Sequence, residues 1–184
     1  MKKGILIATA LLLTVKGFSQ IYLSKDKSAQ IKFFSETPVE NISATNDAVT
    51  SILNSTTDSI VVKVPVNAFI FPKSLMQEHF NENYMESKKF ATSEFRGKVN
   101  EDIDYTKNGE YAATCTGNLR IHGVTKPVTL KGTMKVAEGK VTLDSKFSVK
   151  LVDYNIEVPK VVFKNIAEDI QVTMTATYSP YVKK

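Results

Sequence analysis

The strongest constraint on the fold is a regular alternation of apolar and polar residues that runs through most of the chain. Successive side chains of a β-strand point to opposite faces, so this alternation predicts strands that are each buried on one face. Residues 40–53 fit neither a strand nor a helix period cleanly, and we interpret them as strand. The clearly alternating stretches are residues 21–23, 30–36, 60–66, 95–99, 111–121, 128–136, 141–151 and 170–178.

These stretches predict an all-β fold of about eight antiparallel strands, as a closed barrel or a two-sheet sandwich. Several stretches are long, which favours a barrel of long, tilted strands. A transmembrane barrel is the alternative, because its apolar face points to lipid and its polar face lines the lumen. Here the polar face carries Lys131, Lys135, Lys146 and Lys150. Packing so many lysines into a narrow lumen would be costly, so we expect the apolar face to point inward.

One stretch, residues 69–87, changes from the strand period to the helix period. Met76, Phe80 and Tyr84 are four residues apart, which places them on one face of a helix. Ser74 followed by Gln77 fits a capping box, with the serine oxygen accepting from a backbone N–H. Glu78 would then lie in the first turn, near the positive end of the helix dipole. We predict one inserted amphipathic helix over about 74–86 whose apolar face covers a barrel end.

Small residues recur on the predicted inward face of neighbouring strands. An eight-stranded barrel has room for one small ligand when its inward side chains stay small, so these positions predict an apolar cavity. The alternative is that the glycines mark bends or close approaches between backbones. The positions are Gly97, Ala113, Cys115, Gly117, Gly132 and Ser145.

The first nineteen residues resemble a cleaved export signal, followed by one domain over residues 20–184. A basic N-terminal region precedes an apolar run over residues 4–15, and this run is shorter than a typical transmembrane helix. Small residues at Gly17 and Ser19 predict cleavage before Gln20. Removing the leader lowers the formal charge of +5 to +2, because three of the lysines lie within it. We therefore expect a periplasmic or secreted protein with no integral membrane span and no affinity for nucleic acid.

No motif for catalysis or metal binding stands out. The two histidines, His79 and His122, are expected to make surface, capping or loop hydrogen bonds, and no H-E-x-x-H or C-x-x-C spacing is present. Cys115 is the single cysteine, and its inward apolar position predicts an inert thiol. We therefore predict no catalytic residue, no metal and no cofactor.

Three segments resemble the YceI-like family. They are Leu75–Ser87 with the following Phe90, Phe95 and Gly97, then Gly117–Val128 (GNLRIHGVTKPV), and finally Asp153–Pro159. The resemblance covers essentially the whole mature chain. It implies a lipocalin-like, eight-stranded antiparallel barrel that is exported and holds polyisoprenoid lipids in an elongated apolar cavity. It brings no established catalytic residues. The chain departs from the family at residues 88–91, where a proline tends to follow the aromatic residue.

These observations together predict an exported protein that sequesters or carries an apolar chain, such as an isoprenoid lipid. One rival is an enzyme or stress factor that acts on a lipid or small amide, with His79 or His122 as base. The other is a structural barrel with a filled core. The pattern leaves the oligomeric state open, a dimer included. The residues predicted to line the pocket are Phe69, Phe71, Met76, Phe80, Tyr84, Phe95, Leu119, Ile121, Met134, Phe147 and Met174.

Overall fold

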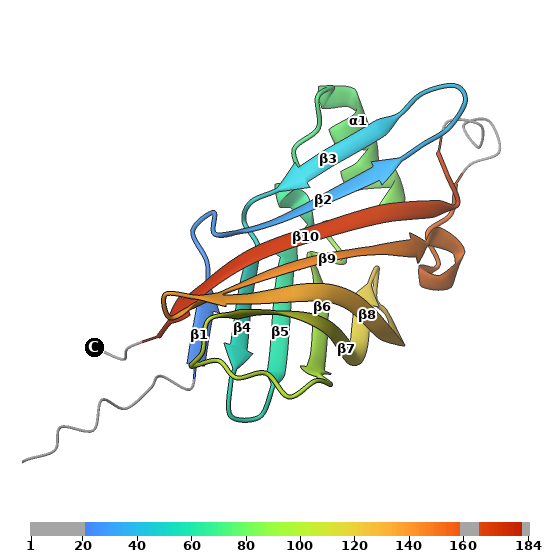
Figure 1. Cartoon of the computed structure of the whole chain (residues 1–184). Helices are drawn as coiled ribbons and strands as arrows, with labels where there is room; N and C mark the ends of the chain where they lie inside the picture. The colour runs from blue at the N-terminus through green and yellow to red at the C-terminus, as the bar shows by residue number, and fades with distance from the viewer. Residues whose placement is uncertain (1–20, 159–165, 182–184) are drawn as a thin grey trace, which may run out of the picture.

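The computed structural model describes residues 21–158 and 166–181, which form one curved antiparallel sheet with short helical segments (Figure 1). The predicted leader lies outside the described residues, as does part of the apolar connection after residue 153. The strands are β1 (Ile21–Ser24), β2 (Ala29–Ser35), β3 (Ile42–Asn46), β4 (Thr50–Asn54), β5 (Ser59–Pro65), β6 (Thr92–Val99), β7 (Gly109–Ile121), β8 (Val124–Ala137), β9 (Lys140–Lys150) and β10 (Asp169–Pro180). The helical segments are η1 (Val66–Ala68), α1 (Ser74–His79), η2 (Phe80–Tyr84) and η3 (Leu151–Tyr154).

The sheet closes on itself, as the alternation predicted. Its strand order is β1-β4-β5-β6-β7-β8-β9-β10-β2-β3, and the ring closes where β1 also pairs with β10. β1 and β2 are two halves of one strand line, because both pair with β10 and with the β3–β4 line. Counted by strand lines, the barrel has eight strands, and residues 40–53 supply both halves of one line.

The apolar face of each strand points into the barrel. Buried side chains alternate with exposed ones along β5, β8 and β10. Lys135 and Lys146 are exposed on the outer face, so the arrangement with a lysine-lined lumen is wrong. This orientation follows from burial energetics, since each apolar side chain removed from water stabilises the fold while each buried unpaired lysine would oppose it.

One end of the barrel is filled by large side chains. Tyr178 and Leu53 are fully buried there, and the Tyr178 hydroxyl lies 2.7 Å from the Ser51 hydroxyl. The loop over residues 100–108 is mostly polar in sequence, yet it also buries Ile103 and Tyr105. The Tyr105 hydroxyl donates to Asp58 at 3.1 Å, which fixes the loop across this end. We call it the packed end.

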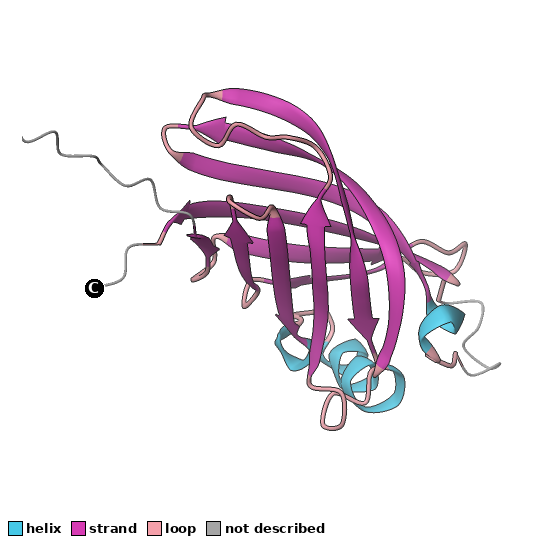
Figure 2. Ribbon diagram, turned by 90° about the horizontal axis from the view of Figure 1, so that it is seen from below, coloured by secondary structure: helices cyan, strands magenta, loops and turns pink. Residues whose placement is uncertain are grey.

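The helical segments gather at the opposite end (Figures 1 and 2). The predicted helix is present, but it is α-helical only over α1 and continues as a π-helix in η2, where the Met85 N–H donates to the Phe80 carbonyl at 2.9 Å. The predicted capping box is wrong. Lys73 is the N-cap, and the Gln77 side chain instead accepts the Phe71 N–H at 3.1 Å. No acidic residue lies in the first turn of α1, so the expected dipole role of Glu78 is also wrong.

Candidate functional site

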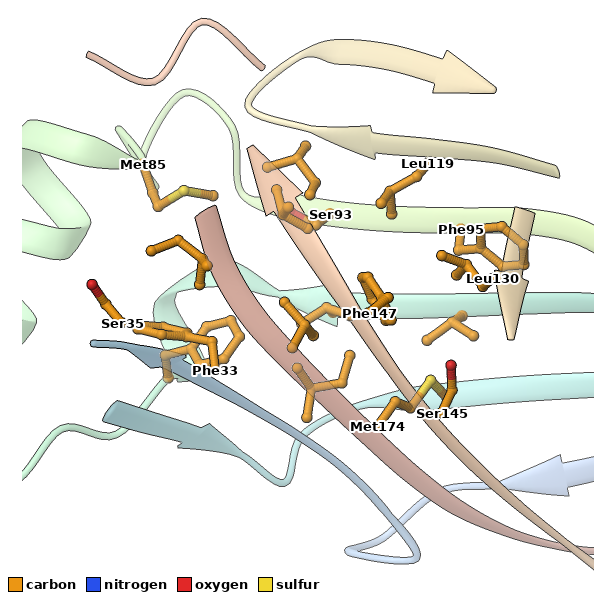
Figure 3. Close-up of a pocket in the computed structure, with 18 of the residues that line it drawn as sticks. Phe33, Ser35, Met85, Ser93, Phe95, Leu119, Leu130, Ser145, Phe147 and Met174 are labelled. Atoms are coloured by element: carbon orange, nitrogen blue, oxygen red, sulfur yellow. The ribbon is translucent and has the colours of Figure 1, made fainter. Parts of the chain in front are cut away.

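An apolar cavity of about 560 Å³ lies between the barrel wall and the α1–η2 segment. Figure 3 shows side chains of Phe147, Leu130 and Met174 pointing into this space from three neighbouring strands. The volume lies within the range of ordinary small-molecule sites. Inward-facing residues such as Phe147 and Leu143 are only half-buried, because the space in front of them is open. The barrel is therefore not a filled structural core at this end.

A row of small residues across three paired strands makes room for the cavity. Ala113 on β7 pairs with Gly132 on β8, and Gly132 pairs with Ser145 on β9. All three line the cavity, as does Cys115. Larger side chains at Ala113 and Ser145 would take up space in the cavity. A Cβ on Gly132 would also lie 2.5 Å from the Asp144 carbonyl oxygen, so this glycine both lines the cavity and permits a close approach of backbones.

Two of the predicted small residues have a different role. Gly97 and Gly117 pair directly across β6 and β7, and neither lines the cavity. A Cβ on Gly117 would lie 2.2 Å from the Arg96 carbonyl oxygen, and one on Gly97 would lie 2.5 Å from the Phe95 ring. These glycines permit a close approach of backbones and leave space for the Phe95 ring, which is the alternative weighed for them from the sequence.

Four phenylalanines form a cluster where the helical segment meets the barrel. Phe33 of β2 lies 5.3 Å from Phe69, 5.6 Å from Phe71 and 5.5 Å from Phe80, measured between ring centroids. Phe80 also lies 5.0 Å from Phe71. Rings at these separations attract one another beyond the burial of their area. The cluster holds η2 against β2 and forms one wall of the cavity.

All eleven residues named from the sequence line the cavity, which brings together the helical segment and β6 to β10. Their role in binding a ligand is a prediction. The sequence reasoning did not name Phe33, Ile31, Met85 or Leu143, which also line it. Ile31 and Phe33 could have been found, because they alternate on the short stretch 30–36. Met85 could not, because the π-helical turn moves it out of the register of a regular helix.

Three of the polar residues that line the cavity lie at the helical end. Lys73 and Glu40 both line the cavity and form an ion pair with each other. His79, the last residue of α1, also lines it. Deeper in the barrel, burial raises the pKa of the Cys115 thiol to about 12, and the nearby Glu101 carboxylate contributes to the shift. The thiol is protonated at ordinary pH and is a poor nucleophile.

His122 joins three segments outside the cavity wall. Its Nδ1–H donates to the Tyr154 carbonyl at 3.2 Å, and its Nε2 lies 3.0 Å from the Glu86 carboxylate. Its ring packs on Phe90 with centroids 4.4 Å apart. The expected backbone hydrogen bond is present, and the ring anchors the chain just after η2 rather than facing the cavity.

The described residues contain no group of three or more His, Cys, Asp or Glu side chains placed to hold a metal ion. Of the two histidines named as possible bases, only His79 reaches the cavity. Within the same part of the chain, no helix is long and apolar enough to cross a membrane.

Comparison with known sequences decides the family. A sequence model of the YceI-like domain matches residues 19–178. The chain belongs to the YceI-like family. A UPF0312 protein of Pseudomonas fluorescens (strain SBW25) is 36% identical to this YceI-like chain over 86 residues. That match covers 43% of this chain and 42% of the relative, so the two align over less than half of either length.

Solved structures confirm the fold of this YceI-like chain at low sequence identity. A polyisoprenoid binding domain from Saccharophagus degradans superposes with a TM-score of 0.75 and 11% identity, over 89% of this chain and 99% of that one. BcnA of Burkholderia cenocepacia gives a TM-score of 0.67 and 14% identity, over 82% and 96%. The YCEI protein of Campylobacter jejuni gives 0.56 and 16%, over 100% and 94%.

Proposed function

We propose that this protein is exported and sequesters or carries an apolar chain, such as a polyisoprenoid lipid, inside the barrel. The observation that carries the proposal is the apolar cavity of about 560 Å³, created by the Ala113–Gly132–Ser145 row and walled by aromatic and aliphatic side chains. The likeness to a polyisoprenoid binding domain supports this ligand class. The leader-like residues 1–19 support export.

Binding would be driven by burial of apolar surface. Each Å² of apolar ligand surface that leaves water contributes about 25 cal/mol, so a chain of a few isoprene units needs few polar contacts. Selectivity would then follow length and shape. The polar group of an amphiphile would lie near Lys73, Glu40 and His79, because these polar side chains line the cavity at the helical end.

A pair of adjacent alanines on β7 gives a matched test. Ala113 faces the cavity and is 7% exposed, whereas Ala112 faces solvent. Ala113→Phe places a ring in the cavity, and Ala112→Phe places the same ring outside. We expect Ala113→Phe to weaken binding of a fluorescent prenyl alcohol by at least about 10-fold, and Ala112→Phe to leave it within about 2-fold, by fluorescence titration.

Two further results bear on the proposal. Mass spectrometry of protein purified from its native host should detect a co-purified apolar lipid in the wild type and in Ala112→Phe, but not in Ala113→Phe. If circular dichroism shows that both variants are folded and both bind equally well, the prenyl ligand does not occupy the cavity. Turnover of a lipid substrate that is lost in His79→Ala while binding persists would favour the enzyme.

A further inference from the structure

Exposed apolar side chains lie on several segments that border the cavity. The described residues contain six exposed large hydrophobic side chains, and four of them lie on the segments that border the cavity. Each of the four either lines the cavity or is adjacent in sequence to a residue that does. We call them the mouth patch: Val39, Ile70, Leu75 and Val152, which are 61%, 64%, 60% and 76% exposed.

The patch is continuous with the cavity through Leu75. Its side chain lines the cavity and is also 60% exposed, so no polar collar separates the apolar interior from the surface at this point. Val152 follows Leu151, which lines the cavity from η3, and Val39 precedes Glu40, which lines it from the β2–β3 connection. Three separate segments that border the cavity thus carry exposed apolar side chains. Scattered exposed hydrophobic residues need no explanation, but a group around a cavity mouth points to an interaction site.

Charges beside the patch are neutralised in pairs. Lys73 pairs with Glu40, and Lys126 pairs with Asp153 at 3.0 Å. Paired charges oppose contact with an apolar phase less than isolated ones do. The outer face of the helical segment carries exposed Glu78 and Glu82, which would repel an anionic surface. Exposed Lys88 and Lys150 lie on the neighbouring segments, so the charge near the patch is mixed in sign and fits a surface without net charge.

We propose that the mouth patch docks on the surface of a neutral, zwitterionic lipid bilayer, so that the lipid ligand moves between membrane and cavity without crossing water. The inference rests on the proposed function. A lipid ligand with very low solubility in water needs a donor membrane in direct contact with the opening of the cavity. Apolar side chains inserted at the headgroup boundary give weak, reversible binding, which suits a carrier that must also leave.

Val39 and Val152 allow the patch to be changed without changing the cavity wall. Neither lines the cavity, so Val39→Ser with Val152→Ser should leave prenyl alcohol binding in solution unchanged. Ile52 on β4 is 41% exposed near the packed end, which makes Ile52→Ser the control. In flotation with phosphatidylcholine vesicles, we expect the double variant to lose about 10-fold in bound fraction and the control to stay within about 2-fold. Transfer of a fluorescent prenyl chain from those vesicles should slow in parallel, and added phosphatidylglycerol should not increase binding.

The outcomes separate the docking proposal from the proposed function. If prenyl alcohol binding is normal and the double variant and the control associate equally with vesicles, the docking proposal is overturned. The proposed carrier function then still stands. Vesicle association that requires phosphatidylglycerol overturns docking on a neutral surface. Transfer that depends on the patch without any vesicle association overturns it in favour of a protein donor. Vesicle association that depends on the patch, in a protein that binds no prenyl alcohol, supports docking and removes the proposed function.

Discussion

Gly117 shows how a single residue without a side chain can fix the distance between two strands. A Cβ at this position would lie 2.2 Å from the Arg96 carbonyl oxygen and 2.4 Å from the Gly97 Cα. Both obstacles are backbone atoms, so β6 and β7 would have to separate. We expect Gly117→Ala to lower the free energy of unfolding by about 1–3 kcal/mol, measured by urea denaturation.

Gly139 provides the control for this prediction. It lies in the β8–β9 turn with φ +73°, and a Cβ there would meet nothing within 4 Å. Gly139→Ala costs only the backbone strain of a left-handed residue, about 1 kcal/mol. A loss for Gly117→Ala no larger than that for Gly139→Ala would show that the β6–β7 approach is not tight.

The Cys115 thiol gives a prediction on pH and access. Burial raises its pKa to about 12, so the reactive thiolate forms only as the pH rises toward that value. At pH 8 the thiolate fraction is about one in ten thousand, compared with about one in four for an ordinary thiol. We expect a thiol reagent such as DTNB to react at least about 100-fold more slowly with the folded protein than with the urea-unfolded chain. Equal rates would place the thiol in water.

The inward position of Cys115 was predicted correctly from the sequence, and the reason is general. Position in an alternating strand determines the face of the sheet, and the face determines burial. The same reasoning left two roles open for Gly97 and Gly117, because alternation says which face a residue belongs to but not how closely two strands approach. That distance depends on cross-strand register, which pairs these two glycines directly.

The helical segment is the element whose details the sequence predicted least well. Its existence and its apolar face followed from the spacing of Met76, Phe80 and Tyr84, and all three line the cavity. Its capping and its π-helical half did not follow. The Gln77 side chain is engaged by the Phe71 N–H, a contact that depends on how the chain enters the helix. Local signals compete with such tertiary contacts, and here the tertiary contacts determine the outcome.

Phe80 tests whether this element serves binding or only folding. Its ring packs within 5.0–5.5 Å of three other phenylalanine rings, and it is half-buried on the cavity wall. Full burial would make Phe→Ala cost about 3–5 kcal/mol, so for this half-buried ring we expect about 1–2 kcal/mol of stability. Binding of a prenyl alcohol should fall by more than about 10-fold, measured by titration.

Phe90 is the matched control for Phe80. It is also half-buried and packs on the His122 ring, but it does not line the cavity. Phe90→Ala should cost a comparable amount of stability and leave prenyl alcohol binding within about 2-fold. Equal losses of binding in the two variants would identify the helical segment as a structural plug with no direct contact to the ligand.

The barrel is tightly packed at one end and holds an open cavity in the other half. Tyr22, Leu53, Tyr105 and Tyr178 fill the packed end, while the small-residue row keeps the other half open. The alternating pattern predicted closure and the inward face correctly, because burial of one face permits few other arrangements. It did not predict which end would be filled. The packing of that end depends on Ile103 and Tyr105, which come from a loop whose sequence is mostly polar.

This division implies that the ligand itself stabilises the protein. An open apolar cavity forfeits the contacts that its wall would make in a filled core, and a bound chain restores them. A ligand at 100 times its Kd adds about 2.7 kcal/mol to the free energy of unfolding, which raises Tm by about 5–10 °C for a domain of this size. The Tm of the wild type and of Ala112→Phe should rise by this amount with a prenyl alcohol in scanning calorimetry. The Tm of Ala113→Phe should rise by about half as much or less at the same ligand concentration, because the ring takes up part of the cavity and weakens binding. An equal rise of Tm in Ala113→Phe would mean that the prenyl alcohol binds elsewhere on the folded protein. The open half of the barrel would then need another explanation.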